Sequence, residues 1–221
     1  YHVISNINYR DLAMMYDIAV RTESESVEFA LLDPIPGKTD VLMLNKEQRN
    51  EALASARSLT VTISGAERNG IPMPKIVQFD QFIRRLSDDR SERGEYDKGI
   101  IDSFPCYAGW VFSRILPDGN VNACLKAHRI PVGNINIDRF KDLWNSLNMK
   151  VFRKETAICE KISPFFSQIG NDPNAACGCH RGCDDLGRNM LFHRSLAKLN
   201  IIEKITLKTA AKIYRSNVGS R

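Results

Sequence analysis

The sequence predicts an α/β fold, in which a region of alternating strands and helices precedes a small cysteine-bearing domain. Apolar runs that suit buried strands alternate with runs of helical period over residues 1–86. A charged segment comes next, and a strand–turn–strand pattern follows it. Because strands separated by helices pair in parallel, we expect residues 1–86 to form an open sheet, or part of a barrel, covered by helices.

The first repeat of this alternation is a strand at 2–5, a turn at Asn6 and Asn8, and an amphipathic helix. The helix places four apolar side chains on one face, namely Leu12, Met15, Tyr16 and Ala19. The next strand spans 26–31. It ends there because the prolines and the glycine of residues 34–37 forbid its continuation.

The second helix is expected to begin at a capping box. Asn45 and Gln48 have the spacing at which each side chain bonds the backbone N–H of the other. The helix should run through Ala56 and close at Gly70 and Pro72. Residues 60–63 (Thr-Val-Thr-Ile) would equally suit a strand, so both interpretations stay open there.

Residues 87–100 are almost wholly charged or small. Such a segment cannot contribute to a core, so we expect an exposed linker between two domains. The predicted organisation is a unit at 1–86, this linker at 87–100, a cysteine-bearing domain at 101–190 and basic helices at 191–221.

The second domain should open with a β-hairpin. Its strands are residues 110–115 and 121–125, and the turn is Pro117-Asp118-Gly119-Asn120. Asp138 is expected to cap a short helix that bears Phe140, Leu143, Trp144 and Leu147. A glycine-rich loop and a helical C-terminal tail complete the pattern.

Composition limits the expected cellular location of the protein and the kinds of partner it binds. No apolar run approaches the roughly 20 residues that span a bilayer, and the N-terminus lacks a signal peptide, so we expect a cytoplasmic protein without a membrane partner. The net charge is +5, and no aromatic residues interleave with the basic ones, so a nucleic-acid partner is not expected. The chain begins at Tyr1 and runs at once into an apolar segment, from which we expect further sequence upstream.

All six cysteines lie after residue 100, and this clustering points to a shared ligand. They are Cys106, Cys124, Cys159, Cys177, Cys179 and Cys183. Disulfides of a secreted domain are one alternative, but a chain of this length does not need such staples. In a reducing compartment, metal or iron–sulfur ligation accounts best for the clustering.

The cysteines fall into two units. Cys106-x12-Gly119-x4-Cys124 places two thiols at the ends of the predicted hairpin, whose strands bring them near one another. The loop at 177–183 carries three thiols in the spacing Cys-x-Cys-x3-Cys, with glycines that let the backbone wrap round a metal. For Cys159, which has no near neighbour, an ordinary thiol and a ligand are equally good interpretations. Four thiolates would also suit zinc.

These residues, in this order, resemble the SPASM or twitch auxiliary-cluster domain of radical S-adenosylmethionine (SAM) enzymes. The motifs that carry the resemblance are Phe104-Pro105-Cys106-Tyr107-Ala108-Gly109-Trp110, Pro117-Asp118-Gly119-x-Val121, Cys124, Pro131-Val132-Gly133-Asn134-Ile135, Phe140-x-x-Leu143-Trp144-Asn145-Ser146 and Phe152-Arg153. They cover roughly residues 104–183. The upstream alternation is similar to the last strands and helices of the radical SAM barrel. The resemblance therefore implies the C-terminal part of a partial (β/α) barrel, followed by a small SPASM/twitch-like domain and a helical tail.

The resemblance also implies cofactors. This chain would bind an auxiliary 4Fe–4S cluster, and the full-length enzyme would bind SAM and a second 4Fe–4S cluster. The family's Cys-x3-Cys-x2-Cys loop for the catalytic cluster is absent from this sequence, and we expect it upstream. Because the chain has fewer cysteines than a full SPASM pattern, one auxiliary cluster is expected, with two as the open alternative. The expected ligands are Cys106 and Cys124, with two of the other four cysteines.

Finally, the resemblance implies an oxidoreductase or modifying enzyme that acts on a small molecule or a peptide, with a reducing partner such as flavodoxin or ferredoxin. By fold analogy alone, Asn6 and Asn8 are expected to contact the cofactor or substrate, with capping as their alternative role. The competing function is a zinc-binding module whose basic C-terminal helices bind a nucleic acid or a protein.

Overall fold

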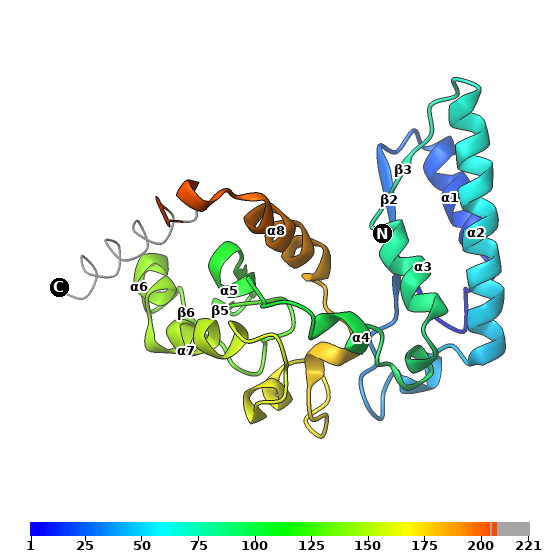
Figure 1. The fold of residues 1–221 in the computed structure, drawn as a ribbon. Helices are drawn as coiled ribbons and strands as arrows, with labels where there is room; N and C mark the ends of the chain where they lie inside the picture. Colours follow the sequence, from blue (N-terminus) through cyan, green and yellow to red (C-terminus); the bar gives the residue numbers. More distant parts are fainter. Residues whose placement is uncertain (204, 207–221) are drawn as a thin grey trace.

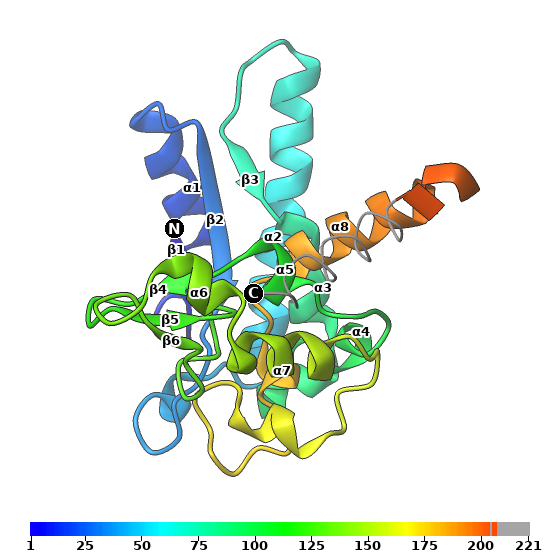
Figure 2. The ribbon, with the colours of Figure 1, turned by 90° about the vertical axis from the view of Figure 1, so that its left-hand side faces the viewer.

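The computed structural model of the protein describes residues 1–203, 205 and 206. They form two mixed α/β units that lie beside one another, with helix α4 between them (Figures 1 and 2). The predicted tail helices beyond residue 206 fall outside the described residues. Within the described part of the chain, no helix is both long enough and apolar enough to cross a membrane.

The first unit is a three-stranded parallel sheet with three long helices. Its elements are β1 (His2–Ile4), α1 (Leu12–Arg21), β2 (Ser26–Leu31), a 3-10 turn η1 (Asp40–Leu42), α2 (Lys46–Arg68), β3 (Lys75–Val77) and α3 (Phe79–Ser87). The strand order is β1-β2-β3, and both pairings are parallel, as predicted from the alternation. The described residues show no barrel, so the partial barrel stays a prediction.

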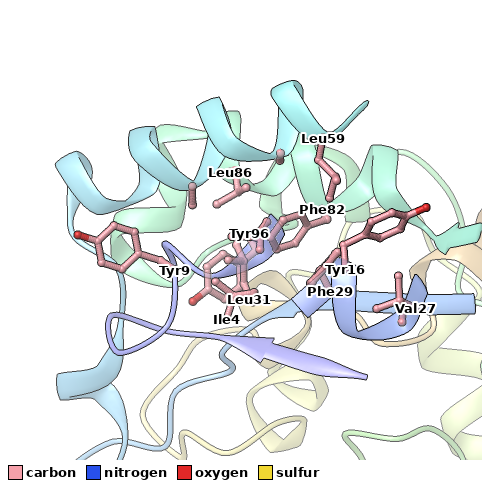
Figure 3. Close-up of a cluster of buried hydrophobic side chains, with 14 residues drawn as sticks. Ile4, Tyr9, Tyr16, Val27, Phe29, Leu31, Leu59, Phe82, Leu86 and Tyr96 are labelled. Carbon is pink, nitrogen blue, oxygen red and sulfur yellow. The ribbon is translucent and has the colours of Figure 1, made fainter. Parts of the chain in front are cut away.

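The core of this unit lies between the sheet and its helices (Figure 3). Val27, Phe29 and Leu31 alternate along β2 on the buried face, where they meet Phe82 and Leu86 of α3. The intervening β2 residues, 28 and 30, lie on the opposite face, as the period of two in a strand requires. One face of the sheet is thus covered by helices, while the other remains available to line a site.

Helix α2 begins at the predicted capping box. Asn45 Oδ1 accepts from Gln48 N at 2.9 Å, and Gln48 Oε1 accepts from Asn45 N at 3.1 Å. The helix then continues through residues 60–63, so the alternative of a strand there is wrong. The helix tolerates these four β-branched residues because Thr60, Val61 and Thr62 point into solvent, where β-branching lowers helix propensity only slightly.

The segment 87–100 was expected to be exposed, and this expectation is wrong for its central residues. It forms a 3-10 helix η2 (Asp89–Arg93) and begins α4 (Lys98–Ile101). Tyr96 is buried and donates a hydrogen bond from its hydroxyl to Leu32 O at 2.7 Å. Asp97 is 0% exposed. A charged residue can be buried here because arginines of α3 neutralise it, which composition alone does not reveal.

The second unit combines a small antiparallel sheet with short helices. Its elements are α5 (Ala108–Val111), β4 (Arg114–Ile115), β5 (Asn120–Asn122), β6 (Gly133–Asn134), α6 (Phe140–Trp144), α7 (Leu147–Thr156), the 3-10 helices η3 (Pro164–Gln168) and η4 (Gly178–Arg181), and α8 (Leu186–Lys198). The predicted hairpin is present as β4 and β5, and β6 pairs with β5 on its other side.

Three boundaries in this unit differ from expectation. Residues 110 and 111 belong to α5 instead of the hairpin strand, and Arg153 fixes this turn by donating from Nε to Gly109 O at 2.7 Å. The N-cap of α6 is Arg139, not Asp138. Leu147 begins the separate helix α7, because the Ser146 hydroxyl accepts from Met149 N at 3.2 Å and starts a new helix there.

The capping box predicts a measurable contribution to stability. Asn45→Ala removes the side-chain acceptor at the start of α2, so the free energy of unfolding in urea should fall by about 1 kcal/mol. Asn45→Ser keeps an oxygen at the same position and should retain most of the parent's stability. An Asn45→Ala protein as stable as the parent would show that the cap contributes nothing.

Candidate metal centre

Four of the six cysteines line a single pocket. Cys106 precedes α5, Cys124 follows β5, Cys179 lies in η4, and Cys183 precedes α8. The cavity volume is about 30 Å³. The fold therefore brings the two hairpin thiols together with two thiols of the 177–183 loop. That these sulfur atoms ligate a metal remains a prediction.

The remaining two cysteines lie elsewhere. Cys177 is buried behind the pocket, and its side chain hydrogen-bonds with Cys179. Cys159 is exposed and does not line the pocket. Of the four cysteines among which the sequence left the choice open, Cys179 and Cys183 are thus the two that face the hairpin pair.

The wall of the pocket is largely apolar. Its hydrophobic members come from α4, α5, α7, η3 and the residue after η3, and they are Ile101, Ala108, Phe152, Phe166 and Ile169. Such a wall limits the access of water, which influences both the stability and the reduction potential of a metal centre.

Two N–H groups point at the sulfur of Cys106. Ala108 N donates to Sγ at 3.5 Å, and Asn189 Nδ2 donates to it at 3.6 Å. Asn189 lies on α8, is 1% exposed, and also accepts from Tyr107 N at 2.7 Å through its Oδ1. It therefore fixes the Cys106 segment against α8. Hydrogen bonds to sulfur are one means by which proteins tune iron–sulfur centres.

The cysteine loop is held by Asp97. Cys183 N donates to Asp97 Oδ2 at 2.6 Å, and Asp97 N donates to His180 O at 3.1 Å. Arg85 forms two bonds to the carboxylate, at 2.7 and 3.0 Å, and Arg84 forms a third. Burial by itself raises the pKa of Asp97, but the charge of Arg85 and these hydrogen bonds outweigh it, so the pKa lies below its ordinary value.

Two glycines shape the loop as the sequence predicted. A Cβ at Gly178 would lie 1.7 Å from the carbonyl oxygen of Ile169, so only glycine allows the two backbones to approach this closely. Gly182 has a φ of 128°, which side-chain-bearing residues rarely adopt. The loop can therefore turn back toward the hairpin between Cys179 and Cys183.

The thiols of the metal-free pocket favour their protonated form. Burial raises the pKa of Cys106, Cys124 and Cys183, and for Cys124 and Cys183 the nearby Cys106 adds to the effect. Metal binding at this pocket would accordingly release protons.

Cys177 and Cys179 influence each other's ionisation. The hydrogen bond with Cys177, followed by burial, raises the pKa of Cys179. The same hydrogen bond and the neighbouring His180 lower the pKa of Cys177 to about 5, against the opposing effect of burial. The hydrogen bond with Cys177 raises the pKa of His180 despite burial, and Asp102 adds to this effect.

Two buried lysines line the same pocket, and the sequence analysis did not anticipate either of them. Lys126 Nζ donates to Gly182 O at 2.8 Å and forms an ion pair with Asp33 at 2.9 Å. Lys161 is 1% exposed. No spacing in the sequence predicts that a lysine is buried. The position of Lys126, two residues after Cys124, was the only indication in the sequence.

Asn6 and Asn8 lie in the loop after β1 and bond to the backbone. Asn6 Nδ2 donates to Val41 O at 2.8 Å, and Asn8 Nδ2 donates to Val3 O at 3.0 Å. Asn8 Oδ1 also accepts from Ser5 N at 2.9 Å. The structure gives both residues a role in the turn, and their contact with a cofactor stays a prediction.

A second, polar pocket lies between the sheet, α3 and the cysteine loop. Its volume is about 490 Å³, and its lining includes Glu28 on β2, Gln78 and Gln81 near the start of α3, and Cys183 and Asp184 of the cysteine loop. Cys183 thus lies in the lining of both pockets. A molecule bound in the polar pocket would be adjacent to a candidate metal ligand.

Comparison with known families agrees with this geometry. The model of the SPASM family, an iron–sulfur cluster-binding domain, matches residues 106–164. The match begins at Cys106 and includes Cys124 and Cys159, whereas the loop cysteines follow it. Residues 106–164 therefore match a SPASM-type iron–sulfur cluster-binding domain, as the resemblance predicts for this part of the chain. Comparison with curated proteins and with solved structures gives no match.

The donor set fits an iron–sulfur cluster. It offers four sulfur atoms from one pocket, an apolar wall, and N–H donors to sulfur. Within residues 1–203, 205 and 206, no three His, Cys, Asp or Glu side chains converge as the ligands of a single metal ion.

The position of Asp97 predicts that its substitution destabilises the protein. Asp97→Asn leaves two arginines without their buried counter-charge, which should cost about 3–5 kcal/mol in urea unfolding. Asp80→Asn changes the same charge on an exposed site of α3 and should have little effect. Equal stability of the two variants would contradict the role assigned to Asp97.

The pH dependence has a definite sign. Because the pKa of Asp97 is lowered in the folded protein, its contribution is complete above the unfolded-state pKa of about 3.9 and is lost as the pH falls through the folded-state value. The difference in Tm between the parent and Asp97→Asn should be constant near neutral pH and shrink below about pH 4. A difference that grows in acid would refute this assignment.

Proposed function

We propose that this chain is part of a radical SAM enzyme and that Cys106, Cys124, Cys179 and Cys183 hold an auxiliary 4Fe–4S cluster. The observation that carries the proposal is that these four thiols, from two distant segments, line one largely apolar pocket, two of them within the matched SPASM region. The ligands proposed here include two residues beyond the matched range, which extends the site to the 177–183 loop.

When bound, such a cluster exchanges single electrons or accepts a donor atom from a substrate. The chain's own residues then have separate tasks. Asp97 holds the loop that carries Cys183, Asn189 holds the segment that carries Cys106, and the apolar wall limits the entry of water. These tasks are to position the thiols and to control their surroundings.

The polar pocket is a candidate binding site for the substrate. In the resembled family a radical derived from SAM abstracts a hydrogen atom from a substrate near the auxiliary cluster. Here the sheet, α3 and the cysteine loop enclose the polar pocket together, with Cys183 in its lining. We therefore propose that a small polar molecule or a peptide side chain binds there, beside the auxiliary centre.

The metal content tests the proposal directly. Protein purified without oxygen should be brown and contain iron and acid-labile sulfide, with about four of each per chain for one cluster. Colourless protein with stoichiometric zinc would instead support the zinc-binding module. A full-length protein that contains the Cys-x3-Cys-x2-Cys loop should also reductively cleave SAM, and failure to do so would reject the radical SAM part of the proposal.

The choice of ligands is tested by single substitutions. Cys124→Ala and Cys183→Ala each remove a pocket thiol, so each variant should lose most of its bound iron. Cys159→Ala is the matched control and should retain the parent's iron content, because Cys159 is exposed and lies outside the pocket. Loss of iron from Cys159→Ala, or full retention by Cys183→Ala, would require a different set of ligands.

A further inference from the structure

Lys161 is buried among main-chain carbonyl groups at the wall of the cysteine pocket. Its side chain is 1% exposed, and its Nζ donates to the carbonyl oxygens of Ile101 at 3.2 Å, Phe104 at 3.1 Å and Ile158 at 3.1 Å. The carbonyl of Cys159 is a further acceptor. The lysine thus ties the segment that precedes Cys106 to the segment around Cys159.

This environment requires the charged form of the lysine. A neutral amine has two N–H bonds and a lone pair, and among four carbonyl oxygens the lone pair would face the lone pairs of an oxygen. An ammonium group has three donors and no acceptor, which matches the surrounding oxygens. The pocket wall therefore contains a buried positive charge.

Lys161 has no carboxylate partner within the part of the chain that the structure describes. Asp102 lies close by, but its Oδ1 accepts from the main-chain N of Lys161 at 2.9 Å, and its Oδ2 bonds His180 Nε2 at 3.1 Å. A buried charge that only neutral groups solvate is costly, so its retention calls for a compensating negative charge.

The other charged groups of the pocket do not supply this compensation. Lys126 is paired with Asp33, and Asp185 is paired with Arg188. Asp184 forms no ion pair among the described residues, and the cations that act on it are Lys126 and Arg85. The thiol on which Lys161 acts is Cys106, where its charge opposes the larger effect of burial on the pKa.

We propose that Lys161 is the counter-charge of the metal–thiolate centre and raises its reduction potential. The inference rests on the proposed function above. A cluster held by four thiolates carries a net negative charge, and gaining one electron makes that charge larger. A fixed cation nearby stabilises the reduced form more than the oxidised form, and the low dielectric of a buried site strengthens the interaction.

Redox titration of the iron-loaded protein, monitored by electron paramagnetic resonance, tests this inference. Lys161→Met and Lys161→Gln remove the charge, and both should shift the midpoint potential to more negative values. Lys161→Arg should stay near the parent. Lys126→Met should give a smaller negative shift, because Lys126 shares its charge with Asp33. Lys150→Met, an exposed change on α7, should give none, since solvent screens it.

The outcomes separate charge from structure. Glutamine keeps N–H donors for the carbonyl oxygens, so it supports folding where methionine fails. If the chain folds with arginine at position 161 but with neither glutamine nor methionine, the charge of Lys161 serves its hydrogen bonds to the carbonyl groups. That result would overturn the proposal. Iron-loaded neutral variants with the parent's potential would overturn it as well. If the parent itself binds zinc instead of iron, the proposed function fails first, and the inference fails with it.

Discussion

The structure depends on one buried carboxylate. Asp97 is wholly enclosed and could not remain ionised there without compensation, which it receives from two arginines of α3 and from the main-chain N–H of Cys183. The arginines belong to the first unit, Asp97 to the connecting segment and Cys183 to the cysteine loop. The hydrogen bonds and ion pairs of Asp97 therefore set how these three parts lie relative to one another. These bonds hold the part of the cysteine loop that carries Cys183 at the pocket.

Much of the first unit could be predicted because its signals are local. The alternation in β2 and the capping box at Asn45 depend on residues a few positions apart. The short strand β3 gave no such signal, since three residues cannot display a period. The burial of Asp97 was also beyond sequence reasoning, because its arginine partners on α3 reveal themselves only after the chain folds.

The candidate site, too, could be predicted only where its signals are local. Cysteine spacing identified the hairpin pair and the loop, since few other roles place thiols at such intervals. It could not select Cys179 and Cys183 over Cys159, because that choice depends on which side chains face the pocket. Nor could it find Lys126, Lys161 or Asn189. A lysine or an asparagine in a sequence resembles a surface residue, and only tertiary contacts place it at the candidate site.

The pocket draws its walls from positions far apart in the chain, from Ile101 on α4 to Asp185 just before α8. During synthesis, the cavity can therefore close only after residues as late as Asp185 have left the ribosome. A centre that needs all four thiols could form only after that point.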